Sequence, residues 1–576
     1  MMERESEMAA EDTAASWTFR TVNSLTKVYP DSEPSEQDAH SDPIVFLGET
    51  VSFQIAMRPP AVTGAPRPVR VSVGRASADV VTLSMVDLVP CDLPAFPGHD
   101  DGYDRDAPGL YPDLLTPLNG DSLWLEEGVW SSIWVDVRVT DPARGPRIPI
   151  VIALRDDADV LLFEHRSSVL VVPRELPPLS LINSHYIHCD SLAQYYGVEM
   201  FSEAHWQILE RFMASAGAMG VNATMAPIWT PSLDTEKGGR RLKTQLLDIS
   251  LADGRYSFGF DRLGRWLDVC RRAGIDYLEM AHFFTQWGAI ATPSIYVDVD
   301  GVEVEQFGWH VEAQDPSYRA FLEQLMPELI AYLDTEWDLT RIAFHISDEP
   351  SGEEGLRNYI AAKSVVADLV GPCVIMESLS DVAYYDNGVV PQPVVATDAV
   401  QPFLARAVPD LWVYYCVAQN RDVANRFFAL PSSRSRVIGH QLFAFDCAGF
   451  VHWGFNFYNS QLSRRPIDPF LDTTASGAFP GGDTFIVYPG DEGRPLESIR
   501  YRVFADAMND LRAMAWLAEL AGTSEVLTLI DTDGRGGRLG FDAFSYDPLH
   551  YLEVRHAINQ RLAGLLAEGE PAIRSA

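Results

Sequence analysis

Two adjacent carboxylic acids, Asp348 and Glu349, follow an apolar run at residues 341–346 whose pattern predicts a buried strand. In an α/β barrel the carboxyl ends of the strands form the active-site face, so such a strand brings both acids to the place where substrates bind. Paired acids there can act as a general acid/base and as a stabiliser of developing charge. A structural interpretation is also open, because Ser351 and Glu354 fit a capping box and first-turn acids favour the helix dipole.

Other polar and aromatic side chains are expected at the ends of the remaining strands. Aromatic rings beside acids and amides are typical of a sugar site, because the apolar face of a pyranose stacks on a ring while its hydroxyls need directional partners. A single Trp or Tyr in such a strand is more often part of the core. The candidate substrate-binding residues are His185, Glu279, His282, Glu377, Asp398, Tyr415, Trp453 and Asn456.

A metal site finds little support in the pattern of histidines and acids. His185 and His188 are three residues apart, so they face opposite sides of a strand unless the strand ends between them. Later strand ends offer Glu377, Trp453 and Asn456 rather than a full His and Asp ligand set. We therefore expect no metal and no cofactor. The sequence also lacks a GxSxG elbow, a P-loop and a GxGxxG after the first strand.

Strand-like and helix-length segments alternate between residues 176 and 520, which predicts a parallel α/β fold. Eight strands with intervening helices suit a (β/α)8 TIM-like barrel with insertions. Asp315 followed by Pro316 is typical of a helix start. The expected strands lie at about 181–187, 221–227, 274–281, 340–347, 373–378, 394–398, 411–416 and 449–456, and the expected helices at 203–218, 260–272, 316–334, 353–369 and 498–520.

The barrel is expected to have neighbours on both sides in the sequence. Residues 17–175 contain short alternating runs separated by Pro, Gly and Asp clusters, which predicts a β-sandwich. Residues 1–16 are polar and acidic, and we expect a disordered tail there. Residues 521–576 are too short for a further domain, so we expect an extension packed on the barrel, with a strand at 526–530 and a helix at 548–568.

Composition limits the partners and the compartment. The 576 residues carry a net charge of −37, which argues against nucleic acid and anionic membrane surfaces. No apolar stretch has transmembrane length, and the acidic N-terminus does not resemble a secretory signal. Six cysteines without CxxC spacing are typical of reduced thiols. We therefore expect a cytoplasmic protein with a carbohydrate substrate and with no nucleic-acid or membrane partner, and assembly into a homo-oligomer stays open.

Three stretches carry a family resemblance: residues 344–350 (FHISDEP), residues 449–456 (GFVHWGFN), and residues 482–490 (GDTFIVYPG) with 498–500 (SIR). Together they resemble the family 123 glycoside hydrolases and the related proteins grouped as domain of unknown function 4091. The likeness covers the chain from about residue 130 onward, and its specific part is the Asp-Glu-Pro element.

The resemblance implies a glycosidase that acts on small oligosaccharides or glycoconjugates. It implies substrate-assisted, retaining hydrolysis of a β-linked N-acetylhexosamine, typically N-acetylgalactosamine. Glu349 would then be the general acid/base, with its pKa raised by burial and by the like charge of Asp348. Asp348 would orient the acetamido group, Tyr415 would bond the acetamido oxygen, and Trp453 would be a sugar platform.

Three alternatives stay open at the level of sequence. A substrate without an acetamido group would need a two-carboxylate mechanism, with Glu279 or Glu377 as the second group. A carbohydrate-binding protein without catalysis would use Asp348 and Glu349 only as helix caps. A metal-dependent barrel hydrolase is the third alternative. Characterised relatives are generally exported, whereas no export signal is visible here.

Overall fold

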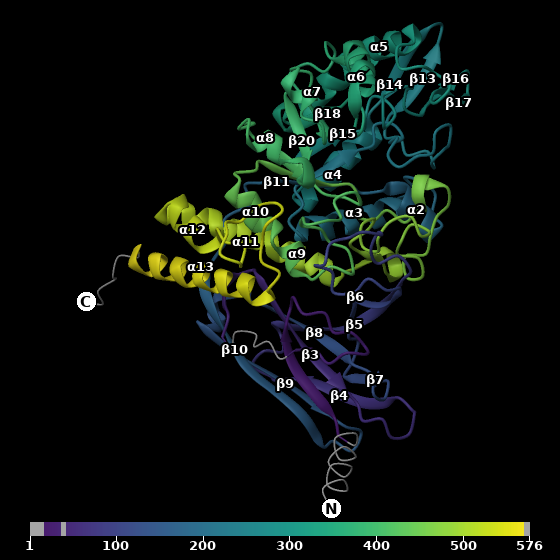
Figure 1. Ribbon diagram of the computed structural model, residues 1–576. Coiled ribbons are helices and arrows are strands. Elements are labelled where there is room, and N and C mark those ends of the chain that lie inside the picture. The colour runs from purple at the N-terminus through teal and green to yellow at the C-terminus, as the bar shows by residue number, and fades with distance from the viewer. Residues whose placement is uncertain (1–15, 36–41, 570–576) are drawn as a thin grey trace, which may run out of the picture.

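The computed structural model describes residues 16–35 and 42–569 (Figure 1). The tail expected at residues 1–16 lies outside the described residues except for Ser16. None of the helices in these ranges combines the length and the apolar character that crossing a membrane requires.

The N-terminal part consists of two five-stranded sheets, drawn in purple and blue in the lower half of Figure 1. The first sheet has the order β1 (Thr18–Asn23), β3 (Thr50–Arg58), β8 (Ser131–Arg138), β5 (Val81–Cys91) and β6 (Gly109–Pro117). The second has the order β2 (Ile44–Leu47), β10 (Leu161–Glu175), β9 (Arg147–Arg155), β4 (Arg67–Val73) and β7 (Ser122–Leu125).

One hydrophobic cluster is shared by the two sheets, with Ile55 from the first and Ile150 from the second among its members. The alternation along β9 explains this packing. Ile148, Ile150 and Ile152 are buried, whereas Arg147 lies exposed on the other face. Sheets with one apolar face each bury those faces against one another. The β-rich character predicted for this part of the chain is therefore confirmed.

Eight parallel strands close into a barrel after the N-terminal sheets. The circle is completed by β22 pairing with β11, where Ile182 lies beside Gly449. Each of the eight strands expected from the sequence is confirmed. In barrel order they are β11 (Ile182–His185), β12 (Ala223–Ala226), β15 (Tyr277–Met280), β18 (Ile342–His345), β19 (Val374–Leu379), β20 (Gln392–Ala396), β21 (Trp412–Tyr414) and β22 (Gly449–His452).

All five expected helices are also confirmed, within a few residues of the predicted bounds. The carboxylate of Asp315 accepts the amide of Ser317 at 2.8 Å and caps the helix that starts at Pro316. The five are α3 (Glu203–Ala218), α4 (Asp261–Ala273), α5 (Pro316–Glu336), α6 (Gly352–Val366) and α11 (Ile499–Ala521). Shorter helices are α2 (Cys189–Tyr196), α7 (Ala383–Asp386), α8 (Gln401–Leu404), α9 (Ser433–Arg436) and α10 (Ile438–Ala444).

Two insertions, one between β12 and α4 and one between β15 and α5, together form a four-stranded sheet that the sequence did not predict. Its order is β14 (Arg255–Gly259), β13 (Asp248–Ala252), β16 (Ile295–Val299) and β17 (Val302–Phe307), and α4 and β15 separate the two insertions in the chain. A short ribbon of β23 (Tyr488–Pro489) and β24 (Pro495–Leu496) follows the barrel.

The C-terminal extension differs from expectation in one element. Residues 526–530 were predicted to be a strand, but they lie in a helix, α12 (Thr523–Ile530). Val526 and Ile530 are its buried residues, and a spacing of four places them on one helical face. The last helix, α13 (Pro548–Gly569), confirms the helix expected at 548–568. It contacts α11 and β2, and Figure 1 shows it, in yellow, alongside the barrel helices and the N-terminal sheets.

Candidate active site

A cavity of ≈280 Å³ opens at the carboxyl ends of the barrel strands and contains both acids of the pair. Tyr186 follows β11, Tyr414 ends β21 and Trp453 follows β22, and all three line the same cavity. A cavity of similar size lies between the N-terminal sheets and α13, but its acids Glu49 and Asp506 are paired with arginines.

The backbone around the acid pair shows that the pair does not cap a helix. Helix α6 begins at Gly352, the side chain of Ser351 makes no capping hydrogen bond, and the acids of the first turn are Glu353 and Glu354. The capping interpretation of the pair is therefore wrong. Glu349 also has φ +44°, in the left-handed region that costs a residue with a side chain about 1–2 kcal/mol. Such strain is concentrated at functional sites.

The surroundings of the pair raise the pKa of both acids. Asp348 and Glu349 are partly exposed to the cavity and enclosed by protein elsewhere. Burial raises the pKa of Asp348 well above its ordinary value, and the charges of Glu349 and Asp234 raise it further. Burial also raises the pKa of Glu349, while the Tyr414 hydroxyl, which donates to Oε1 of Glu349 at 2.5 Å, lowers it. Two neighbouring like charges that protein largely encloses resist ionising together.

A second layer of polar side chains lies beneath the acid pair, inside the barrel. Glu279 accepts hydrogen bonds from the Tyr186 hydroxyl at 2.8 Å and from Nε2 of His345 at 2.7 Å. Glu377 accepts the backbone amides of residues 346 and 347 at 3.2 and 3.0 Å. His282 packs against His345 with ring centroids 4.8 Å apart. Glu279, His282 and Glu377 were predicted to bind substrate, but they do not line the cavity.

Of the other predicted residues, Trp453 lines the cavity and donates from Nε1 to Asp483 at 3.1 Å. Asn456 bonds the amide and carbonyl of His188 at 2.9 and 3.1 Å and so fixes the loop after β11. Asp398 lies exposed and accepts a bond from Gln419 at 3.0 Å.

His185 and Tyr415 lie on the outer side of the barrel strands, toward the surrounding helices, rather than at the cavity. The ring of His185 is buried against His452 and Phe504. Tyr415 is buried against Phe450. Adjacent residues of a strand face opposite ways, so Tyr414 reaches the cavity in place of Tyr415.

Asp234 and Trp287 are among the cavity residues that the sequence did not indicate. Both belong to loops outside the strands. Burial raises the pKa of Asp234 to about 6. Trp287 is 57% exposed, and its backbone amide donates to the carbonyl of Asp348 at 2.9 Å. An aromatic ring between Gln286 and Gly288 in a loop after a barrel strand was the available signal for Trp287.

Comparisons with known proteins agree with this arrangement. Residues 186–517 match the family model described as glycoside hydrolase 123, catalytic domain. A family 123 glycoside hydrolase from Clostridium perfringens, whose structure was determined to detail glycolipid glycan hydrolysis, superposes with a TM-score of 0.69 at 11% identity, covering 96% of this chain and 98% of that one. A β-glucuronidase from Parabacteroides merdae gives a TM-score of 0.32 at 10% identity, covering 80% of this chain and 50% of that one. A search of curated proteins found no match.

Proposed function

The chain belongs to glycoside hydrolase family 123 and is therefore a glycosidase, and from this premise we propose that it cleaves a β-linked N-acetylhexosamine by a substrate-assisted, retaining route. The observation that carries the proposal is the pair Asp348 and Glu349, adjacent in the chain, in a cavity at the strand ends. Neighbouring residues are poorly placed to flank a sugar ring from opposite sides, so the substrate itself supplies the nucleophile.

In the proposed reaction, the acetamido carbonyl oxygen attacks the anomeric carbon while Glu349 gives its proton to the departing glycosidic oxygen. Glu349 then takes a proton from water, which opens the cyclic intermediate with overall retention of configuration. Asp348 accepts a hydrogen bond from the acetamido N–H and stabilises the positive charge that develops beside it.

The substrate also sets the position of the shared proton in this proposal. In the free protein, Tyr414 stabilises the ionised form of Glu349, whereas nothing comparable lowers the pKa of Asp348. An acetamido N–H bonded to Asp348 stabilises its carboxylate, so the proton moves to Glu349, where the leaving oxygen needs it. A sugar without this group leaves the proton on the wrong acid.

Placement of the other acids weighs against the two-carboxylate alternative with Glu279 or Glu377. Neither lines the cavity, and each is engaged in hydrogen bonds beneath it. Asp234 does line the cavity, so it is the acid that a two-carboxylate route would use. The structurally similar Clostridium perfringens enzyme is described as hydrolysing glycolipid glycans, so these glycans are natural substrates to assay with this protein.

The test compares nitrophenyl β-glycosides of N-acetylgalactosamine, N-acetylglucosamine and galactose. We expect turnover of an acetamido sugar, inhibition by a thiazoline analogue of the cyclic intermediate, and a loss of about 10²–10⁴-fold in kcat for Glu349→Gln. The matched control is Glu353→Gln, since the Glu353 side chain is 97% exposed in the first turn of α6. Equal turnover of galactosides, no thiazoline inhibition, and inactivation by Asp234→Asn but not Asp348→Asn would replace this route with the two-carboxylate one.

A further inference from the structure

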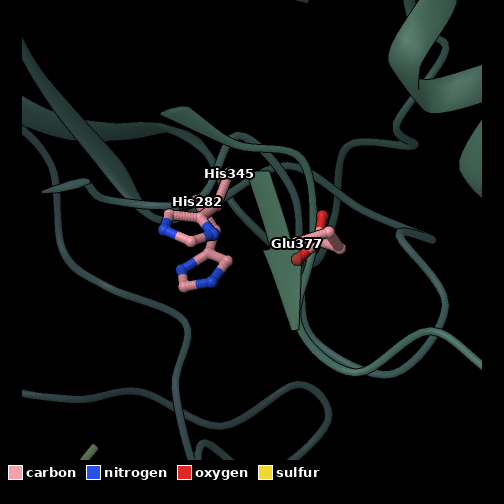
Figure 2. A group of neighbouring side chains, drawn as sticks. All are labelled: His282, His345 and Glu377. Carbon is pink, nitrogen blue, oxygen red and sulfur yellow. The ribbon is translucent and has the colours of Figure 1, made fainter. Parts of the chain in front are cut away.

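His282, His345 and Glu377 form a compact cluster beneath the acid pair (Figure 2). They follow or belong to β15, β18 and β19, three neighbouring strands of the barrel. One potential ligand atom from each residue lies within 4.8 Å of the other two. All three side chains are buried, and Figure 2 shows the two imidazole rings next to one another, with Glu377 on the other side of the strand drawn between them.

Each member of the cluster keeps one polar atom that lacks a hydrogen-bond partner among the described residues. These atoms are Nδ1 of His282, Nδ1 of His345 and Oε1 of Glu377. Leaving a buried polar atom unsatisfied costs about 1–3 kcal/mol. Three such atoms on neighbouring buried side chains are therefore expensive unless a further group binds there.

Two of the three side chains, His345 and Glu377, are already held in a way that suits metal binding. Nε2 of His345 bonds Glu279 at 2.7 Å, and a carboxylate on the far nitrogen of an imidazole is the usual partner of a metal-binding histidine. Oε2 of Glu377 accepts hydrogen bonds from two backbone amides, so Oε1 is the oxygen that an ion would bind. Trp229 bonds the carbonyl of His282 at 2.9 Å and holds that residue in place.

We propose that His282, His345 and Glu377 bind one divalent transition-metal ion of the zinc class beneath the floor of the active-site cavity. Two imidazoles and one carboxylate are a donor set that zinc and similar ions prefer to the all-oxygen sites of calcium or magnesium. Tetrahedral zinc ligands lie about 2.0–2.2 Å from the ion and therefore about 3.3–3.6 Å from one another. The ligand atoms of the cluster lie within 4.8 Å of one another, so the three side chains would close onto the ion as it binds.

The ion would position the acid pair rather than act on the substrate, because none of its three ligands lines the cavity. Through Glu377 it would fix residues 346 and 347, which immediately precede Asp348. Its positive charge would also balance the negative charges of the buried carboxylates Glu279 and Glu377. The Tyr359 hydroxyl approaches Glu377 from α6 and competes for its carboxylate.

Measuring the metal content of the protein tests the proposed metal site directly and needs no substrate. A negative result would therefore leave the proposed glycosidase function unaffected. Untagged full-length protein is stripped with a chelator, reloaded with Zn²⁺ or Co²⁺, and freed of excess ion. We expect about one ion per chain, visible absorption from Co²⁺ bound to nitrogen ligands, and a higher unfolding temperature of the loaded protein. His282→Gln and Glu377→Gln should each reduce binding at least tenfold.

The control variant is His205→Gln, because the two ring nitrogens of this buried histidine already have partners, at 2.9 and 3.0 Å. The His205→Gln variant should bind the metal ion as tightly as the unmodified protein does. A folded wild-type protein that retains well under one ion after reloading, or that retains one equally in the Glu377→Gln variant, would overturn the proposal. Ordered water would then be the group that satisfies the three atoms.

Discussion

Glu349 is held between two opposing influences, and their balance sets the strength of the acid. Burial raises its pKa, and the Tyr414 hydroxyl lowers it by donating a hydrogen bond to the carboxylate. In the pH profile of kcat/KM, the fall in activity at alkaline pH should follow the loss of the proton from Glu349.

Tyr414→Phe should therefore move the alkaline limb of the kcat/KM profile to higher pH, because the ionised form of Glu349 loses its donor. We expect kcat/KM at neutral pH to fall by about 10–100-fold, because a hydrogen bond to a charged group contributes about 1.5–3 kcal/mol. Tyr415→Phe is the matched control, since Tyr415 does not line the cavity. A limb that stays in place in Tyr414→Phe would show that the hydroxyl does not tune this acid.

The same burial that raises the pKa of Glu349 makes the acid costly for stability. A carboxyl whose pKa is higher in the folded than in the unfolded protein stabilises the fold at low pH, and that contribution is lost as pH rises through the folded pKa. Glu349→Gln should then be more stable than the parent at alkaline pH, by about 0.5–2 kcal/mol, with a smaller gain in acid. Thermal unfolding from pH 4 to pH 9 measures this, and a gain that is larger in acid would contradict it.

How far the sequence predicted the site depends on the depth of each residue in the barrel. Asp348, Glu349 and Trp453 were assigned to the site and line the cavity. Glu279 and Glu377 come from the correct strand ends but lie one layer deeper, because strand periodicity gives the face of a residue and not its height in the barrel. Asp234 and Trp287 belong to loops, whose paths local patterns do not determine.

At the scale of elements, regular patterns were informative wherever a segment buries a face. The barrel strands are apolar and flanked by amphipathic helices, so their positions followed from periodicity. The sheet of β13, β14, β16 and β17 was missed, because its short strands carry many charged residues, such as Glu303 and Asp298, on exposed faces. The α12 segment was misassigned because eight residues rich in Val, Leu and Ile suit either a strand or a helix.

Close packing between helices yields a prediction at this scale. A Cβ added at Gly217 of α3 would collide with the backbone carbonyl oxygen of Ala273, at the end of α4. Gly217→Ala should therefore destabilise the protein by about 1–3 kcal/mol, although alanine favours a helix more than glycine does. Gly564→Ala in α13 is the matched control, because a Cβ there meets nothing within 4 Å. Chemical denaturation should separate the two, and equal stability would mean that the α3–α4 contact yields easily.

At the scale of the whole molecule, buried ion pairs join the N-terminal sheets to the barrel. Arg434, after β21, bonds Asp100 from the loop between β5 and β6 at 2.8 Å. Arg500 of α11 bonds Asp113 of β6 and also the carbonyls of Gly482 and Phe485, at 2.8 and 2.6 Å. The sequence could not predict these pairs, because hundreds of residues separate the partners and every charge has many alternatives.

The Asp113–Arg500 pair should be the more sensitive part of this junction, because both side chains are about 97% buried. Asp113→Asn leaves the Arg500 charge without its partner, and we expect it to cost about 3–5 kcal/mol. Asp113→Leu combined with Arg500→Met removes both charges and should recover part of that loss. The exposed pair Arg265–Glu203 should show coupling below about 1 kcal/mol in the same double-mutant cycle. Denaturant unfolding measures the coupling energy of each pair. Coupling energies of similar size would mean that water reaches the Asp113–Arg500 pair and that burial does not set the strength of its interaction.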